Sequence, residues 1–337
     1  MEILRWGIIG TGHMAKQFAK LVAINPRHRA TCVYSRTKET GLSFEKKFGV
    51  SAWHEDLNSF LENGDFDAVY IATPHNSHFN LTKESLLKGK AVLCEKPVNF
   101  SLDEFEIIRQ ISTQQKCLIM EGLGLSFNPL VQKLFTAIKN NVVGEITRIE
   151  TRFAKNFDLT IGGRLTDRLL DGGALNEMAS YSLALSHFIL GEPVDFNLDS
   201  CISYKEVDIA STFLLKFPFD KEMLLESSFI SNKSSCAKIF GKNGYITILN
   251  PFYSPSEIVI YPEGSAPIHL RLPQYSKSSL SYTIEAFAKS YFLGELENGH
   301  LTLEDSMHIG VQLHRLRAAA QDNPATRKID TPPARYT

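Results

Sequence analysis

Residues 5–15, RWGIIGTGHMA, decide the fold of this 337-residue chain. The apolar run Arg5–Ile9 leads into the pattern Gly-x-Gly-x-x-Ala at Gly10–Ala15, and a segment with helical spacing of apolar residues follows. A glycine turn between a strand and a helix offers backbone N–H groups and the positive end of the helix dipole to phosphate groups. The residues expected to contact a dinucleotide here are Gly10, Thr11, Gly12, His13 and Met14.

Beyond this motif, apolar runs alternate with amphipathic segments as far as residue 122. The further runs are Ala30–Tyr34, Ala68–Thr73, Ala91–Cys94 and Cys117–Met120. Ser101–Glu104 has the form of a capping box and predicts a helix from Leu102. Apolar strands separated by helices are typical of a parallel sheet covered on both faces, so we expect an α/β Rossmann domain over residues 1–122.

After Gly122 the pattern changes to consecutive strands separated by turns. Asn128-Pro129 predicts a helix to about Asn140, and Gly172-Gly173 opens another to about Leu190. The expected strands are Ile146–Phe153, Ala210–Phe217, Met223–Ile230, Cys236–Phe240, Tyr245–Leu249 and Glu257–Tyr261. The expected later helices are Ser281–Leu293 and Leu303–Arg317, before a polar, Pro-rich tail from Gln321 that should lie on the surface. We expect residues 123–337 to form an α+β substrate-binding and oligomerisation domain with a large, mostly antiparallel open sheet.

Composition excludes several classes of function. The net charge is −1, with no basic excess of the kind that nucleic-acid binding requires. No apolar run approaches the length of a membrane span, and the N-terminus lacks the features of a signal peptide. The five cysteines include no CxxC pair, and no Cys/His cluster has metal-ligand spacing. We therefore expect a cytoplasmic protein with free thiols and no metal site, and neither nucleic acid nor membrane as a partner.

The end of the second strand distinguishes between the two nicotinamide dinucleotides. An NAD-binding protein usually has an acidic residue there, which binds the ribose 2′-hydroxyl. This chain has Ser35-Arg36-Thr37 instead, with no acid until Glu39. The hydroxyls can donate to a 2′-phosphate, and the guanidinium can pair with it. The pattern favours NADP(H), with NAD(H) as the weaker alternative, although an Arg after a strand can also be simply solvated.

Ligands of open parallel sheets bind at the carboxyl ends of the strands. Two further strand ends in this chain therefore provide candidate residues. One group is Thr73, Pro74, His75 and His78, and the other is Glu95 and Lys96. We expect all six to lie near the cofactor. A lysine there can hydrogen-bond a substrate hydroxyl and move its proton, but a strand-end lysine can also be merely solvated. His78 has the alternative of capping the helix that it begins.

The chain resembles the Gfo/Idh/MocA oxidoreductase family over nearly its whole length. The matching pieces are Gly10–Ala15, Ala72-Thr73-Pro74, Glu95-Lys96-Pro97, Gly172-Gly173-Ala174-Leu175 and the Gly241–Gly244 turn. Within the family, the chain most resembles the subgroup of dimeric dihydrodiol dehydrogenase and glucose–fructose oxidoreductase. This closer likeness lies in the stretches AVLCEKP, MEGL and GGAL, and in a Tyr eight residues after the second Gly of GGAL.

The resemblance implies specific roles. It makes Lys96 the catalytic lysine, with a cis bond to Pro97, and it places an acid, Glu177, and a proton donor, Tyr181, at i, i+4 on one helix. From the residues alone, Tyr181 can instead be a core tyrosine, and Glu177 can be an acid favoured by the helix dipole. The chain departs from the subgroup at three places. Glu177 is one methylene longer than the usual Asp, and Gly124 and Ser126 stand where members have a Trp and an Arg. The substrate pocket should therefore be larger and should lack a guanidinium that could bind an anion.

These features predict an NADP(H)-dependent oxidoreductase that transfers hydride to or from a hydroxyl or carbonyl carbon of a small polyol, sugar or diol. The alternative is a catalytically silent NADP-binding sensor of the same fold, because the family includes a regulatory protein. The resemblance also implies a homo-oligomer, a dimer or tetramer, formed through the open sheet.

Overall fold

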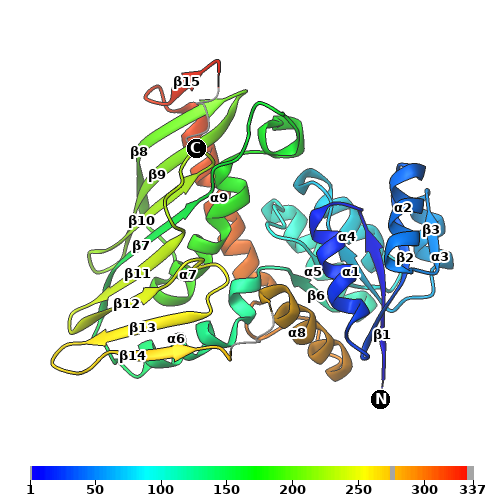
Figure 1. The fold of residues 1–337 in the computed structure, drawn as a ribbon, viewed down its shortest axis with the longest axis horizontal. Coiled ribbons are helices and arrows are strands. Elements are labelled where there is room, and N and C mark those ends of the chain that lie inside the picture. Colours follow the sequence, from blue (N-terminus) through cyan, green and yellow to red (C-terminus); the bar gives the residue numbers. More distant parts are fainter. Residues whose placement is uncertain (1, 274–277, 332–337) are drawn as a thin grey trace. The chain divides into compact units, whose positions relative to one another are not determined.

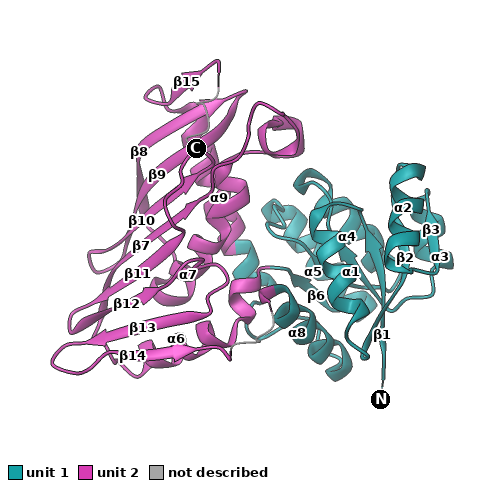
Figure 2. Cartoon of the chain, in the orientation of Figure 1, with its two compact units in different colours: residues 1–122, 280–307 teal, residues 123–279, 308–337 magenta. Residues whose placement is uncertain are grey.

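The computed structural model describes residues 2–273 and 278–331 (Figure 1). The chain forms two compact units (Figure 2). Unit 1 comprises residues 1–122 and 280–307, and unit 2 comprises residues 123–279 and 308–337. The first segment of unit 1 ends at Gly122, and the later segment Leu280–Met307, which lies in the range expected for the second domain, belongs to unit 1.

Unit 1 contains a six-stranded sheet in the order β3-β2-β1-β4-β5-β6, with every pair of neighbours parallel. The strands are β1 (Leu4–Ile9), β2 (His28–Tyr34), β3 (Ala52–His54), β4 (Ala68–Ile71), β5 (Ala91–Cys94) and β6 (Ile119–Glu121). The helices are α1 (His13–Ala23), α2 (Lys38–Phe48), α3 (Leu57–Asn63), α4 (His78–Leu87), α5 (Leu102–Gln115) and α8 (Ser279–Leu293). The Rossmann prediction is confirmed; the short β3 was not expected, because three half-exposed residues give no periodic signal.

Both faces of this sheet are covered. A buried apolar cluster joins one face to α3, α4 and α5 through residues such as Phe60, Leu86 and Phe105. On the other face the Trp6 ring lies 5.0 Å from Phe18 of α1 and 4.9 Å from Phe287 of α8, measured between ring centroids. Helix α8 thus completes the core of unit 1 (Figure 1). In the sequence, most of unit 2 lies between α8 and the first segment of unit 1, residues 1–122.

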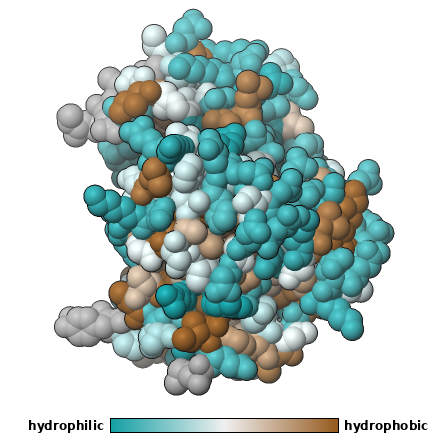
Figure 3. Space-filling view, turned by 90° about the vertical axis from the view of Figure 1, so that its right-hand side faces the viewer, coloured by the Kyte–Doolittle hydropathy of each residue, from teal (hydrophilic) through white to brown (hydrophobic). Residues whose placement is uncertain are grey.

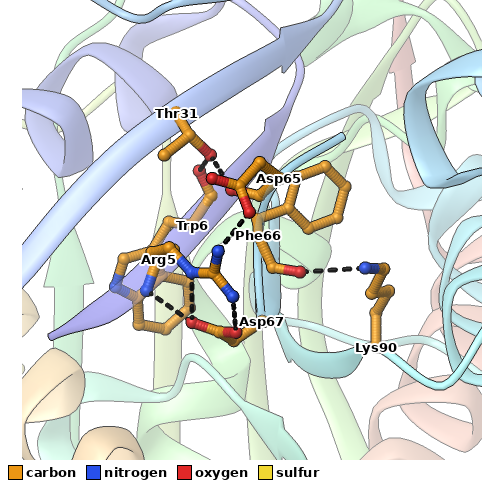
Figure 4. Close-up of polar contacts among 7 residues, drawn as sticks. All are labelled: Arg5, Trp6, Thr31, Asp65, Phe66, Asp67 and Lys90. Carbon is orange, nitrogen blue, oxygen red and sulfur yellow. Dashed lines mark hydrogen bonds and ion pairs between the residues drawn. The ribbon is translucent and has the colours of Figure 1, made fainter. Parts of the chain in front are cut away.

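An ion-pair network ties together the amino ends of β1 and β4 (Figure 4). The Arg5 guanidinium donates to both carboxyl oxygens of Asp67, at 3.1 and 2.6 Å, and also pairs with Asp65. Nearby, Lys90 donates to the Phe66 carbonyl oxygen at 2.9 Å. Burial alone would raise the pKa of Asp67, but the hydrogen bonds and charge of Arg5 lower it below its usual value. The network lies at the amino ends of the strands, whereas the candidate residues lie at their carboxyl ends.

Unit 2 contains a nine-stranded sheet in the order β14-β13-β12-β11-β7-β10-β9-β8-β15. Its strands are β7 (Ile146–Ala154), β8 (Asp195–Tyr204), β9 (Val207–Phe217), β10 (Lys221–Ser228), β11 (Cys236–Gly241), β12 (Gly244–Ile248), β13 (Glu257–Pro262), β14 (Ile268–Arg271) and β15 (Arg327–Ile329). Its helices are α6 (Pro129–Lys139), α7 (Ser180–Leu190) and most of α9 (Leu303–Asp322). Among the described strands of this nine-stranded sheet, only the pairs β7/β10 and β8/β15 are parallel, so the expected mostly antiparallel sheet is confirmed.

The ends of several elements follow local rules. Ser101 and Glu104 form the predicted capping box at α5, and the Asn128 side chain accepts from the N–H of Leu130 at the start of α6. The tail from Gln321, expected to lie on the surface, is mostly exposed in its described part; it continues α9 to Asp322 and then adds β15 beside β8. Its last residues, 332–337, lie outside the described residues.

Helices α6, α7 and α9 lie along one face of the nine-stranded sheet (Figure 1). Over the other face, the described residues place no helix. Half-exposed ion pairs cross neighbouring strands there, Arg148 with Glu222 and Arg152 with Glu226, beside the paired Leu214 and Leu224. This face therefore mixes charge with apolar surface.

The surface drawn in Figure 3 is largely hydrophilic, with hydrophobic residues in separate groups. Within the described residues, no helix is both long and apolar enough to span a bilayer.

Candidate functional site

The glycine loop is built as the sequence pattern requires. Gly10 has φ +105°, and a Cβ there would lie 2.6 Å from the carbonyl oxygen of Ala72, the residue after the neighbouring strand β4. Gly12 is the N-cap of α1, where no side chain bonds the first-turn N–H groups and no acidic residue occupies the first turn. The buried Ala15 keeps α1 close to β1. Bare N–H groups and an uncompensated helix dipole suit the phosphates of a dinucleotide.

Gly12→Ala should fold like the unmodified chain but bind NADPH weakly. A Cβ at this position meets only the Ala72 carbonyl oxygen, at 4.0 Å, so the free protein has room for it. The same methyl group would block the close approach of a pyrophosphate to the backbone. Thermal unfolding and fluorescence titration with NADPH measure the two effects separately.

Gly10→Ala is the matched comparison. Because position 10 combines a left-handed φ with a backbone clash, this variant should lose about 1–3 kcal/mol of stability as well as affinity. Native NADPH affinity in Gly12→Ala would show that the dinucleotide does not bind at this loop.

The turn after β2 divides its three candidate residues into two kinds. The Ser35 side chain is buried, and its hydroxyl lies 3.1 Å from the Thr37 carbonyl oxygen and 2.8 Å from the Thr40 hydroxyl. Arg36 and Thr37 are exposed. Ser35 therefore shapes the turn, and the side chains that the turn leaves accessible to a ligand are those of Arg36 and Thr37.

The segment after β4 is a compact turn held by its own side chains. Ser77 donates to the Pro74 carbonyl oxygen and contacts the Thr73 hydroxyl, each at 2.7 Å, and a 3₁₀ turn at His75–Ser77 leads into α4. His75 is buried, and its ring centroid lies 5.5 Å from that of His78. The segment is thus ordered beside the end of β4, where Ala72 meets the glycine loop.

Lys96 lies in a turn whose main chain is fixed by buried side chains. The Lys96-Pro97 bond is cis, as the resemblance implied. His78, which is 0% exposed, has Nδ1 2.9 Å from the Pro97 carbonyl oxygen and Nε2 3.1 Å from the Thr73 carbonyl oxygen. The Tyr70 hydroxyl donates to the Glu95 carboxylate. His78 thus links the turn after β4 to the turn after β5, a role beyond the helix cap considered from sequence.

A residue that sequence reasoning did not assign, Glu121, lies at the end of β6 next to this turn. Its buried carboxyl accepts from the N–H of Val98 at 3.2 Å. Burial raises the pKa of Glu121 to about 7, and the charge of Lys96 acts in the opposite direction. No sequence signal marks Glu121 as buried, because an acid after a strand is ordinarily solvated.

In unit 2, two glycines explain how the GGAL segment begins its helix. A Cβ on Gly172 would lie 2.6 Å from the Arg164 carbonyl oxygen. Gly173 has φ +115°, and a Cβ there would lie 2.5 Å from the Asp208 carboxyl. That carboxyl accepts from the Leu175 N–H at 2.9 Å, where no helix side chain provides a cap. Burial raises the pKa of Asp208 to about 6.

The helix after GGAL starts with a π-helical turn, Leu175–Ala179, and continues as α7. Such wide turns are rare and often occur at functional sites. Glu177 lies on the π turn and forms an ion pair with Arg164 of the preceding loop. Arg164 carries no sequence motif, and its pairing with Glu177 was not expected from the sequence.

Tyr181 lies in an aromatic cluster of unit 2. Its ring centroid lies 5.8 Å from Phe153 at the end of β7 and 5.5 Å from Tyr253. Phe153 and Tyr253 stack with centroids 4.2 Å apart. Aromatic side chains from two other segments of unit 2 thus lie beside Tyr181. Lys96 belongs to unit 1, whereas Glu177 and Tyr181 belong to unit 2.

A six-stranded parallel sheet in this strand order, with a glycine loop after its first strand, is typical of Rossmann-fold dinucleotide-binding proteins. Residues 4–123 match the model of an oxidoreductase family with an NAD-binding Rossmann fold, and residues 131–247 match the model of the Gfo/Idh/MocA C-terminal domain. The chain belongs to the Gfo/Idh/MocA oxidoreductase family, and it is an oxidoreductase.

Individual relatives agree with this assignment. The chain is 26% identical to trans-1,2-dihydrobenzene-1,2-diol dehydrogenase of Bos taurus, over 77% of this chain and 78% of that protein. It is 25% identical to an NADP⁺-dependent scyllo-inositol 2-dehydrogenase of Bacillus subtilis, over 90% and 93%.

Solved structures show the same fold. An aldose–aldose oxidoreductase from Caulobacter crescentus, complexed with glycerol, has a TM-score of 0.84 at 21% identity, covering 95% of this chain and 98% of that one. A 3-ketoreductase from Actinomadura kijaniata, complexed with NADP and TDP-benzene, has a TM-score of 0.82 at 22% identity, covering 98% and 100%.

Proposed function

We propose that the chain transfers hydride between NADP(H) and a hydroxyl or carbonyl carbon of a small polyol, sugar or diol. The observation that carries the proposal is the turn at Lys96, whose main chain is fixed by His78 and Glu121 at the carboxyl edge of the parallel sheet. Relatives named for diols and inositol support the substrate class. When bound, the nicotinamide supplies the hydride chemistry, and the protein handles binding and the proton.

Each candidate residue has a distinct part in this proposal. The Gly10–Met14 loop holds the pyrophosphate with its N–H groups, and Arg36 with Thr37 binds the 2′-phosphate. Lys96 binds the substrate oxygen, and Tyr181 moves the proton to or from it. Glu177, paired with Arg164, orients the helix face that carries Tyr181. Thr73, Pro74, His75 and Glu95 complete the strand-end wall beside the cofactor.

The experiment is an assay of NADPH and NADH oxidation with a panel of aldoses, ketoses and dicarbonyls. Arg36→Ala should weaken NADPH binding roughly 10- to 100-fold, because a charge-assisted phosphate contact is lost, and should leave NADH binding unchanged. Arg29→Ala is the control and should change neither: Arg29 is an exposed arginine near the start of β2, whereas Arg36 lies in the turn after its end.

Two outcomes would contradict this proposal. Equal or tighter binding of NADH by the unmodified chain would refute the NADP(H) preference. Tight NADPH binding without turnover of any carbonyl compound would favour the alternative of a silent sensor.

We also propose a cytoplasmic homodimer or a tetramer built from it. All five cysteines are free thiols, as a reducing compartment favours. The uncovered face of the nine-stranded sheet, with its Arg–Glu pairs and leucines, supports a contact between two copies, since each copy offers both charges to the other. A monomer in sedimentation velocity at micromolar concentration would refute the oligomer.

A further inference from the structure

Glu121 occupies a special place among the buried carboxyls of unit 1. It lies opposite Cys94 in the register of β5 and β6, and the chain after Cys94 runs directly into Glu95-Lys96-Pro97. Its side chain is 5% exposed, and its Oε1 reaches the N–H of Val98, two residues beyond Lys96. The carboxyl therefore contacts the main chain immediately after the cis bond.

The turn is held from two sides. His78 contacts the carbonyl oxygen of Pro97 at 2.9 Å, and Glu121 accepts from the N–H of Val98 at 3.2 Å. The two contacts are made to the same peptide group, between Pro97 and Val98, which follows the cis Lys96–Pro97 bond. We expect the position of this peptide group to influence the direction in which the Lys96 side chain leaves the turn. A change of charge on Glu121 would therefore act on Lys96 through both the backbone and the electric field.

The groups that face Glu121 come from β5, the turn after it and α9. Lys96 attracts the carboxylate and Glu95 repels it, the Cys94 thiol is affected by its charge, and the nearby Ser306 hydroxyl favours the charged form. Burial is the largest influence and raises the pKa to about 7, so Glu121 changes its charge near neutral pH. Below that pH it is neutral; above it, the carboxylate strengthens its bond to Val98 and attracts the Lys96 ammonium.

We propose that Glu121 is a positioning residue for Lys96: as a carboxylate it fixes the Lys96–Val98 turn and holds the ammonium in place for reaction. The inference rests on the proposed function of Lys96. It implies an acidic limb in the pH profile of kcat that belongs to Glu121, with turnover rising as the carboxyl ionises.

Glu121→Gln tests the charge while keeping an oxygen that can accept from Val98. At pH 8, kcat should fall roughly 10- to 100-fold, the expected loss for one charge-assisted contact. At pH 6, where the native carboxyl is mostly protonated, the difference should be small, so the acidic limb near pH 7 should disappear. The KM for substrate should change little. Glu121→Asp, which keeps the charge but shortens the reach, should lower kcat and retain an acidic limb.

A second measurement does not depend on turnover. In protein with ¹³C-labelled glutamate carboxyls, the NMR signal that both variants lack should titrate near pH 7 in the unmodified chain. A signal that titrates below pH 5, or an unchanged acidic limb in an active Glu121→Gln, would overturn the inference. If the unmodified chain turns over no carbonyl substrate at any pH, the proposed function fails instead, and the NMR titration still decides the ionisation of Glu121.

Discussion

Lys96→Met should reduce kcat by ~10²–10⁴-fold, the usual effect of removing a positioned acid or base. Methionine has a similar length but can neither bind the substrate oxygen as a cation nor move a proton. NADPH should still bind, since its phosphates are assigned to the Gly10–Met14 loop and to Arg36. The turn should keep its shape, because His78 and Glu121 hold main-chain atoms rather than the lysine side chain. Steady-state kinetics, NADPH titration and thermal unfolding measure the three quantities.

Lys88→Met is the matched control. Lys88 follows α4 in the same unit and pairs with Glu62 on the surface, so its loss should leave kcat unchanged. Lys96→Met should also raise the pKa of Glu121 above about 7, because the attraction of the ammonium for the carboxylate is removed. If Lys96→Met retains normal turnover, the assignment of catalysis to the Glu95-Lys96-Pro97 turn is wrong.

Local sequence rules predicted most of unit 1. The glycine loop, the capping box at Ser101 and the apolar strands depend on residues that are close together in the chain. Helix α8 was recognised as a helix but assigned to the wrong unit by position alone. Its membership depends on the packing of Phe287 against Trp6, and no local pattern records a contact across such a sequence separation.

The edges of the nine-stranded sheet were harder to predict. In β8, exposed Asp195, Asn197 and Asp199 alternate with half-buried residues, so the apolar signal is weak. β15 has three residues and exists through its pairing with β8. Both strands depend on tertiary pairing more than on their own residue preferences.

The candidate site also contains both residues that a local sequence motif predicts and residues that only tertiary contacts identify. Gly10, Lys96 and Gly173 lie in motifs, and the structure gives a physical reason for each glycine. Arg164, Glu121 and Asp208 carry no motif, because a charged residue in a loop or at a strand end is ordinarily solvated. Their importance comes from the groups that fold against them: Glu177 beside Arg164, Val98 beside Glu121 and Leu175 beside Asp208.

Tyr181→Phe should lower kcat by ~10²-fold or more, because the variant keeps the ring in its aromatic cluster but loses the hydroxyl that moves the proton. Tyr253→Phe is the matched control: it removes a hydroxyl from the neighbouring ring of the same cluster and should have a much smaller effect.

The double variant Lys96→Met/Tyr181→Phe should be little slower than the slower single variant, because residues that act at one step are not additive. The two residues belong to different units, so this coupling measures directly whether they serve the same proton transfer. Multiplied losses in the double variant would mean that they act at separate steps. Near-normal turnover of Tyr181→Phe would reduce Tyr181 to a member of the aromatic cluster. The proton donor would then be Lys96 itself, because both ring nitrogens of the buried His78 contact main-chain carbonyl oxygens.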